Sequence, residues 1–197
     1  WWGNSILYVR DVRIENARDG IYAGSSSTTI QGSCFAGNVY SLWLLEGTTS
    51  VQSCQFENGV GPGAHITAHA LTGVKVEECT FEHEQLPETA IGHIGLNWCT
   101  GVTIENCTFV GGMNGVGFGF PSTGKVRHCV FESQSTFGVE VVGYSNATVE
   151  DCVLRGQNIA FGVVDSQTEL HARRCVVEDV EDCSVWVGTC SPNTTIN

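Results

Sequence analysis

Two nearby histidines and a third downstream are the first residues whose types suggest acid–base or metal chemistry. His65 and His69 are four residues apart, so in a β-strand both side chains would point to one outer face. On a strand they would stand roughly 13 Å apart, which is too far for one metal ion. His93 would lie beside His69 if it occupied the neighbouring strand. A His69–His93 pair would suit a general base or a metal ligand set, and ordinary polar surface is the alternative.

Two lysines and one glutamate provide a second kind of chemistry. Lys75 and Lys125 are the only lysines, and Glu140 is the only carboxylate centred in an apolar strand pattern. A polysaccharide lyase needs a base that removes the proton α to a uronate carboxylate, and a cation, often Ca²⁺, that neutralises that carboxylate. A glycoside hydrolase needs two carboxylates. We therefore name His69, His93, Glu140 and Lys75 as the catalytic candidates if the protein is an enzyme.

Three aromatic residues are candidates for ligand contact. Tyr22, Trp43 and Trp186 each stand between inward aliphatic residues of an alternating pattern, so they should point outward. Exposed aromatic side chains often mark contacts, and their flat faces suit sugar rings. Packing under loops or against another protein chain is the alternative.

A cluster of four acidic residues could bind Ca²⁺ as a cofactor. The cluster comprises Glu178, Asp179, Glu181 and Asp182. A solvated acidic loop is the alternative interpretation, and no other cofactor and no other metal is expected.

The composition limits the classes of function. The chain has 197 residues, of which 42% are hydrophobic and 15% charged, which fits one folded domain. Nine basic residues stand against 21 acidic ones, giving a formal net charge of −12. A nucleic-acid-binding protein needs a basic surface, and an anionic membrane would repel this chain. No apolar run is long enough to cross a membrane. We expect neither nucleic acid nor membrane as a partner.

A six-residue pattern recurs around the cysteines and shows which elements position these side chains. Cys107, Cys129, Cys152 and Cys175 are separated by 22, 23 and 23 residues, a period typical of repeat proteins. Each unit has an aliphatic residue, two mostly polar residues, a cysteine, one outward residue and an apolar residue, usually Phe. The units are 51–56, 76–81, 104–109, 126–131, 149–154 and 172–177. We assign 14–17 as the first unit, with alanine at the cysteine position, and 30–34 as the second, with one extra residue before Cys34.

The pattern predicts a strand, a two-residue bend and a second strand in every unit. Cysteine and Phe alternate with outward residues as in a strand, and Asn16, Asn106 and Asp151 tolerate the left-handed conformation that such a bend can need. A further apolar strand follows each unit. One unit cannot bury its own apolar face, so the units must stack into a β-solenoid. Before each unit we expect a column of outward residues: Arg13, Thr29, Ser50, Lys75, Thr103, Lys125, Thr148 and His171.

The sequence Val-Thr-Ile-Glu-Asn-Cys-Thr-Phe at 102–109, with the Gly-Val and Gly-Phe strands after it, resembles the right-handed parallel β-helix repeat of pectate-lyase-like proteins. The resemblance covers nearly the whole chain. It implies an all-β, right-handed parallel β-helix of about eight coils, with residues 1–197 as a single domain. That superfamily includes polysaccharide lyases, hydrolases, epimerases, phage tailspikes and repeats without known activity, so the fold does not name a reaction.

One short motif resembles a hydrolase signature. Gly92-His93-Ile94-Gly95 is similar to the Gly-His-Gly motif of polygalacturonases. Those enzymes also carry a cluster of aspartates nearby and an Arg-x-Lys sequence downstream. This sequence has no aspartates in the matching strand and no Arg-x-Lys, which weakens the resemblance to a hydrolase.

The cysteines have two interpretations. Because cysteine is small and apolar, the repeated ones are expected to form a buried ladder of thiols. Neighbouring coils also lie within disulfide range, so bridges between coils stay open. Cys99, Cys183 and Cys190 lie outside the column, and Cys183–Cys190 and Cys99–Cys107 are the pairings to test.

A stacked solenoid has unpaired strands at both ends, which favours contacts with other chains or domains there. We therefore expect a module of a longer chain in an extracellular or cell-surface assembly. The favoured function is a non-catalytic structural or binding module whose outer strands contact a polysaccharide or a protein. The alternative is an enzyme, a lyase, hydrolase or epimerase, that acts on an acidic polysaccharide. A dense outward cluster of acidic and basic residues on adjacent coils would favour the enzyme.

Overall fold

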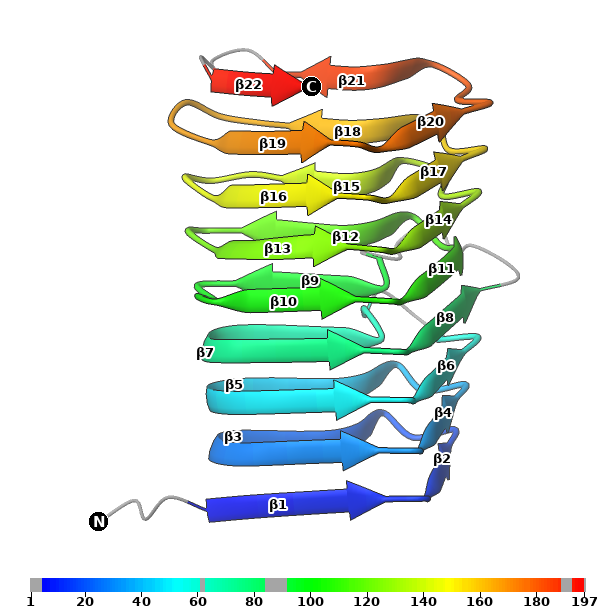
Figure 1. Ribbon diagram of the computed structural model, residues 1–197. Coiled ribbons are helices and arrows are strands. Elements are labelled where there is room, and N and C mark those ends of the chain that lie inside the picture. Colours follow the sequence, from blue (N-terminus) through cyan, green and yellow to red (C-terminus); the bar gives the residue numbers. More distant parts are fainter. Residues whose placement is uncertain (1–4, 61–62, 84–91, 189–192, 197) are drawn as a thin grey trace.

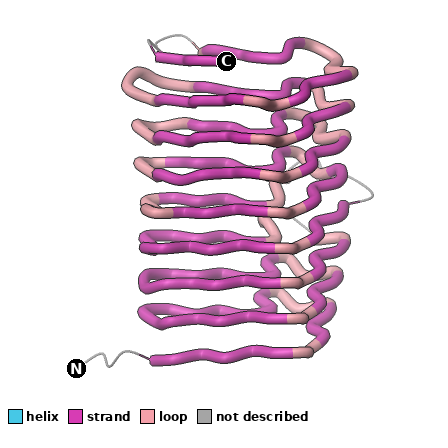
Figure 2. The backbone as a smooth tube through the Cα atoms, in the orientation of Figure 1, coloured by secondary structure: helices cyan, strands magenta, loops and turns pink. Residues whose placement is uncertain are grey.

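The chain folds into a parallel β-solenoid, as the sequence predicts (Figure 1). The computed structural model describes residues 5–60, 63–83, 92–188 and 193–196, and of residues 25, 26 and 193–196 it describes the backbone alone. All regular elements in this part of the chain are strands, stacked coil upon coil from the N-terminal to the C-terminal end (Figure 2). No helix of the described residues is long and apolar enough to cross a membrane.

Two parallel sheets form the walls of the solenoid. One sheet has eight short strands, which confirms the expected number of about eight coils. Its strands are β2 (Arg13–Glu15), β4 (Cys34–Ala36), β6 (Gln55–Glu57), β8 (Thr80–His83), β11 (Thr108–Gly111), β14 (Val130–Glu132), β17 (Val153–Arg155) and β20 (Val176–Glu178).

The second sheet has fourteen strands and folds around the other two sides. Its first four strands are β1 (Ser5–Arg10), β3 (Asp19–Gln31), β5 (Tyr40–Gln52) and β7 (Ile66–Glu77). Beyond β7 each coil contributes two strands. The rear strands are β9 (Ile94–Asn97), β12 (Asn114–Gly119), β15 (Phe137–Val141), β18 (Ile159–Val163) and β21 (Cys183–Val187). The front strands are β10 (Val102–Glu105), β13 (Thr123–Arg127), β16 (Asn146–Glu150), β19 (Glu169–Arg173) and β22 (Asn193–Ile196).

A single left-handed residue makes the bend before each short strand. The bend residues have φ between 51° and 59°, and they are Asp11, Gly32, Ser53, Glu78, Asn106, His128, Asp151 and Arg174. From Asp11 to Asp151 their backbone amides still donate to the next coil, as Asn106 N does to Arg127 O at 3.2 Å. The bend therefore turns the chain without breaking the hydrogen-bond ladder. It lies where the sequence predicts a corner, but of the two polar residues only the second, such as Asn106, forms it, and the first, such as Glu105, belongs to the preceding strand.

Stacked phenylalanines fill the middle of the core. Neighbouring rings are nearly parallel, with centroids 4.6 to 5.1 Å apart, and all five side chains are fully buried. The rings belong to Phe35, Phe56, Phe81, Phe109 and Phe131. Five consecutive coils each add one ring at the spacing of the strands, which confirms the predicted Phe column. Ile14 takes this position on the coil before them, and Leu154 and Val177 take it on the two coils after them.

The cysteines form the predicted internal ladder as free thiols. Cys54, Cys79, Cys107, Cys129 and Cys152 are almost completely buried. Each Sγ lies 3.1 to 3.2 Å from the carbonyl oxygen two residues earlier, so the thiol donates into the bend that precedes it.

The alternative of disulfides is not realised among the described residues. Cys99 and Cys107 are both free, so the Cys99–Cys107 pairing is wrong. Cys183 is also free in the structure, whereas Cys190 lies outside the described residues.

The first two repeat units are aligned differently from what the sequence pattern suggested, and the first one starts earlier. Val9 pairs with Ile30 and Ile14 pairs with Phe35, so the first bend falls at Asp11 and not after Ile14. In the second unit Ser33 is buried at the cysteine position. Cys34 points outward, where its Sγ accepts a hydrogen bond from Arg13. The second unit therefore has no extra residue, and the alignment on Cys34 was wrong.

The structure buries two of the histidines that were expected on the surface. His65 and His93 lie inside the corner that precedes β7 and β9, with parallel rings 5.4 Å apart and 4% and 1% exposed. Their neighbours Ile66 and Ile94 are also buried, because the chain bends there and breaks the strand alternation. Burial lowers the pKa of His93 from 6.5 to about 4. Burial, followed by the nearby His93 and His83, also lowers the pKa of His65 well below 6.5.

These depressed pKa values predict a loss of stability in acid. A histidine whose pKa is lower in the folded state contributes nothing against unfolding above about pH 6.5. As the pH falls below that value, the unfolded chain takes up the proton first and is favoured by ~1.4 kcal/mol per pH unit for each histidine. His65→Phe should reduce this slope between pH 6.5 and 4, as measured by urea unfolding at a series of pH values. His171→Phe, at an exposed histidine, is the matched control, and an unchanged slope in His65→Phe would contradict the explanation.

Candidate functional site

The register confirms most of the predicted outward column on the front strands. Thr29, Ser50, Lys75, Thr103, Lys125, Thr148 and His171 lie side by side on successive coils. Arg13 does not belong to this column, because it lies in β2 opposite Cys34 and Tyr8 takes its place opposite Thr29. Lys75 and Lys125 are separated by Thr103, and Lys75 Nζ is 2.7 Å from Glu77.

The expected pair of His69 and His93 does not form. His69 lies opposite Asn97 in the next coil, and its exposed ring packs against Trp98 with centroids 4.7 Å apart. His93 is buried on the inside of the same coil, where its Nε2 donates to Gly111 O at 3.0 Å. The pairing was wrong because β9 starts one residue after His93, so the two histidines occupy different columns.

The three predicted aromatic residues point outward but do not form one surface. Tyr22 is 61% exposed and lies 6.1 Å from Trp43 near the N-terminal end, ring centroid to ring centroid. Trp186 is 39% exposed and lies 6.0 Å from Phe137 near the C-terminal end. These residues share an outward column of the large sheet. Between Trp43 and Trp186 the column contains Thr67, Gly95, Gly117, Glu140 and Gly162.

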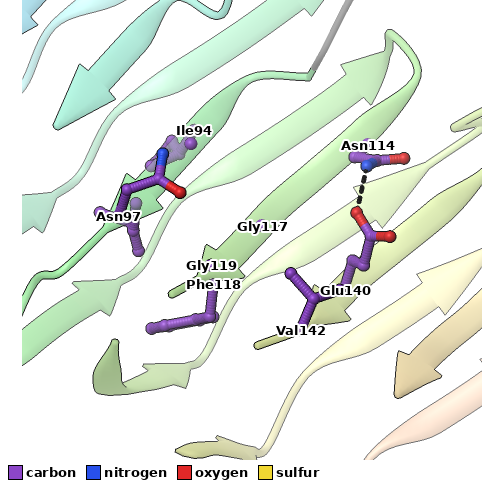
Figure 3. A pocket seen from close by; sticks show the side chains of 10 residues that line it. Ile94, Asn97, Asn114, Gly117, Phe118, Gly119, Glu140 and Val142 are labelled. Atoms are coloured by element: carbon purple, nitrogen blue, oxygen red, sulfur yellow. Dashed lines mark hydrogen bonds between the residues drawn. The ribbon is translucent and has the colours of Figure 1, made fainter. Parts of the chain in front are cut away.

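A small pocket opens in this column, on the outer side of the rear strands (Figure 3). It has a volume of about 130 Å³. Gly95 and Gly117 leave its floor without side chains, and a Cβ atom added at Gly117 would meet nothing closer than 3.9 Å. We call this hollow the Glu140 pocket. It is lined by residues of β9, β12 and β15 and by Val142.

The polar groups of the Glu140 pocket come from three strands. Asn114 Nδ2 donates to Glu140 Oε2 at 2.8 Å, as Figure 3 shows. Asn97 lies across the floor from this pair, and its Oδ1 occupies the space above Gly119. The pocket thus offers a carboxylate as acceptor and two amides that both donate and accept.

The Glu140 carboxylate is half-buried, which changes its acidity. Burial raises its pKa, and the hydrogen bond from Asn114 opposes that rise. Proton uptake by Glu140 therefore begins at a higher pH than for an exposed glutamate. Glu140 is the only carboxylate that lines the pocket. A pair of carboxylates, which glycoside hydrolysis needs, is not present among the lining residues.

The acidic cluster lies at the end of β20 and in the turn that follows. Glu178, Asp179, Glu181 and Asp182 are exposed, and Asp179 takes the left-handed conformation at φ 51°. Within residues 5–60, 63–83, 92–188 and 193–196, no three His, Cys, Asp or Glu side chains gather closely enough to hold a metal ion. Calcium binding at these four residues stays a prediction.

Sequence reasoning identified Glu140 but missed its partners. Asn97, Asn114 and the glycine floor become visible only when the rear strands are aligned by coil, which places Gly95, Gly117 and Glu140 in one column.

The sequence analysis also missed two exposed aromatic residues that directly follow pocket residues in the chain. Trp98 and Phe120 are half-exposed, with ring centroids 6.0 Å apart and positive φ values. Left-handed positions usually favour glycine, so the sequence gives no signal for aromatic residues there.

The stacked coils and the outward pocket define a parallel β-helix protein with a small polar surface site. The family model described as "Right handed beta helix region" matches residues 1–97 and 92–197, and the chain belongs to this family. No curated protein matches the chain. Among solved structures, the chain is similar to QnrB1, a plasmid-mediated fluoroquinolone resistance protein, at 14% identity. The alignment covers 94% of this chain and 91% of that one with a TM-score of 0.23, which carries no argument about function.

The glycines of the large sheet should differ sharply in their tolerance of a methyl group. Gly117→Ala places its Cβ in the open pocket, so the free energy of unfolding should change by less than about 0.5 kcal/mol. Gly124→Ala places its Cβ 2.6 Å from Val102 Cβ and 2.8 Å from Val102 O, so it should destabilise the protein by about 1 to 3 kcal/mol. Urea unfolding of both variants measures the difference. Equal losses would mean that the floor at Gly117 is packed and that the pocket is closed.

Proposed function

We propose that the protein is a non-catalytic binding module that holds one sugar residue of a neutral glycan in the Glu140 pocket. The observation that carries the proposal is the Glu140–Asn114 pair above a floor of glycines on an otherwise regular outer face. In the same column Thr67 precedes Gly95, and Gly162 follows Glu140, with Trp43 and Trp186 one coil further out on either side. The ring of Phe137 fills the space at Gly162, whereas the space at Gly117 is open and has polar groups on both sides.

The chemistry of the lining suits vicinal hydroxyl groups. A sugar hydroxyl can donate to the free oxygen of Glu140 while a neighbouring hydroxyl accepts from an amide nitrogen, and Asn97 can make the same two kinds of bond from the other side. The glycine floor brings the backbone close to the ligand and allows a flat ring to lie against the sheet. A volume of about 130 Å³ suits a single ring.

The charge of the protein favours an uncharged ligand in this pocket. The formal net charge is −12, and the one ionisable group of the pocket is a carboxylate. An acidic sugar would therefore be repelled at long range and again at contact. A neutral sugar meets neither repulsion.

A binding role fits the pocket better than catalysis because it contains one carboxylate and no lysine or arginine. This proposal also includes three expectations for a glycan-binding module: an extracellular or cell-surface location, a protein partner, and contacts at the solenoid ends.

A lyase, hydrolase or epimerase that acts on an acidic polysaccharide is the rival function. The front strands give it some support, because Glu77, Glu105 and Glu150 lie there among basic residues, although Lys75, Arg127 and Arg173 each pair with one of them.

The test is a binding and turnover assay on a panel of neutral and acidic oligosaccharides, measured by calorimetry and by the release of reducing or unsaturated ends. We expect a neutral sugar to bind without turnover. Glu140→Gln should weaken binding about tenfold, which corresponds to the loss of one charge-assisted hydrogen bond. Glu82→Gln, at an exposed glutamate on the short-stranded sheet, is the matched control and should bind like the unaltered protein.

The pH dependence adds a second readout. Because the pKa of Glu140 is raised, binding should weaken on acidification at a higher pH than an exposed glutamate would cause, and Glu140→Gln should abolish that step. Reducing or unsaturated ends that the unaltered protein releases, and that Glu140→Gln or Lys75→Gln does not release, would show that the protein is an enzyme and not a binding module. No binding by the folded protein to any sugar of the panel would overturn the proposal.

A further inference from the structure

Basic and hydroxyl side chains alternate along five successive coils of the front strands. The order along the solenoid axis is Lys75, Thr103, Lys125, Thr148 and His171. Neighbouring parallel strands lie about 4.8 Å apart, so each basic residue of the column has a hydroxyl residue beside it on an adjacent coil. This face lies on the opposite side of the solenoid from the Glu140 pocket, since the front and rear strands form different walls (Figure 1).

Lys125 differs from every other lysine and arginine of the protein in its ion pairing. The chain has nine such residues and 21 acidic ones, and eight of the nine have a carboxylate oxygen within 4.0 Å. Lys125 has no such partner among the described residues. The two ends of the alternating column are both next to acids, with Lys75 2.7 Å from Glu77 and His171 3.6 Å from Glu169. In a protein with excess acid, the ammonium group at the centre of the column is left available.

The surroundings of Lys125 form a groove lined by hydroxyl and amide groups. The groove includes Thr103 and Thr148 on the flanking coils, Thr123 on the same strand, and Asn146. Gly101 keeps its edge open. Arg127 also lines the groove, but its guanidinium donates to Glu105 at 3.0 Å, which neutralises it. His171 lines the groove as well, with its Nε2 3.6 Å from Glu169. Of the lysines and arginines in the lining, Lys125 alone lacks a carboxylate partner among the described residues, and three threonines line the groove around it.

We propose that Lys125, Thr103 and Thr148 form an oxyanion-binding site that takes a carboxylate, sulfate or phosphate group of a ligand. The ammonium group supplies the charge and up to three donors, and the threonine hydroxyls above and below donate to the remaining oxygens. The net charge of −12 opposes the approach of an anion, so the site selects a ligand by short-range hydrogen bonds and not by long-range attraction. The site is independent of the Glu140 pocket and of its proposed sugar.

The test uses isotope-labelled protein and three probes, namely inorganic sulfate, inorganic phosphate and glucuronate, at constant ionic strength set with sodium chloride. Backbone amide resonances of Thr103, Lys125 and Thr148 should shift saturably with at least one probe. Lys125→Gln should weaken that binding about tenfold, as expected for the loss of a charge-assisted hydrogen bond. The comparison of the three probes separates a preference for tetrahedral anions from one for carboxylates.

Lys75→Gln is the matched control, because Lys75 occupies the same column next to the same Thr103 but already pairs with Glu77. It should retain the affinity of the unaltered protein within about twofold, because Glu77 compensates the charge of Lys75 and salt screens what remains at Lys125 two coils away. Shifts that grow linearly with every probe, or that are the same in Lys125→Gln, would overturn the site. An equal loss in Lys75→Gln would show general attraction by surface charge and would overturn it as well.

Discussion

The hydrogen-bond ladder between coils is the interaction on which the rest of this structure depends. Parallel pairing runs through both sheets, with one register shift between Gly47 and Thr49 where β5 pairs with β7. It continues through the bends because the left-handed residues from Asp11 to Asp151 still donate to the next coil. A bend that lost this bond would leave a buried amide without a partner on every coil. The ladder therefore requires one residue with positive φ at the same place in each repeat. Asparagine, aspartate, serine or glycine occupies five of these eight places.

Because the bends of successive coils are aligned, equivalent side chains stack into columns. Each column then has its own physical role. The phenylalanines stack face to face, and the thiols fill the smaller space beside them while donating to the carbonyls of the bend. The outer columns have no such packing requirement. Their residues vary from coil to coil, so the Glu140 pocket and the alternating column at Lys125 both arise where the pattern on the outside changes and the pattern on the inside does not.

Much of the fold was predictable from the sequence because the inward residues repeat. The spacing of Cys107, Cys129 and Cys152 and the Phe two residues after Cys107 specify the coil, the bend and the internal ladder. The first two units were misaligned because Val12 and Ser33 replace cysteine at the inward position, while Cys34 stands one residue later on the outside. A local pattern alone cannot distinguish these cases, since the register is set by pairing with the next coil.

The candidate site was less predictable, for reasons that lie in its geometry. Glu140 stood out as a carboxylate between two valines, but His93 could not be placed without knowing that the chain turns a corner just before β9. The Asn114–Glu140 bond joins residues 26 positions apart, and no spacing rule links them. Within the described part of the chain every lysine and arginine except Lys125 has an ion pair, and some of the partners lie on neighbouring coils, as Arg127 with Glu105 shows.

The column that runs from Trp43 through Gly117 and Glu140 to Trp186 has a consequence for how such a protein can change its ligand. Each coil contributes one residue to this wall, in register with the residues on the adjacent coils. A larger residue at Gly95 or Gly117, where a Cβ atom has open space, would fill the hollow without disturbing the core, whereas at Gly162 it would meet the ring of Phe137. Ligand recognition on this wall can therefore change by single substitutions, each on a different coil.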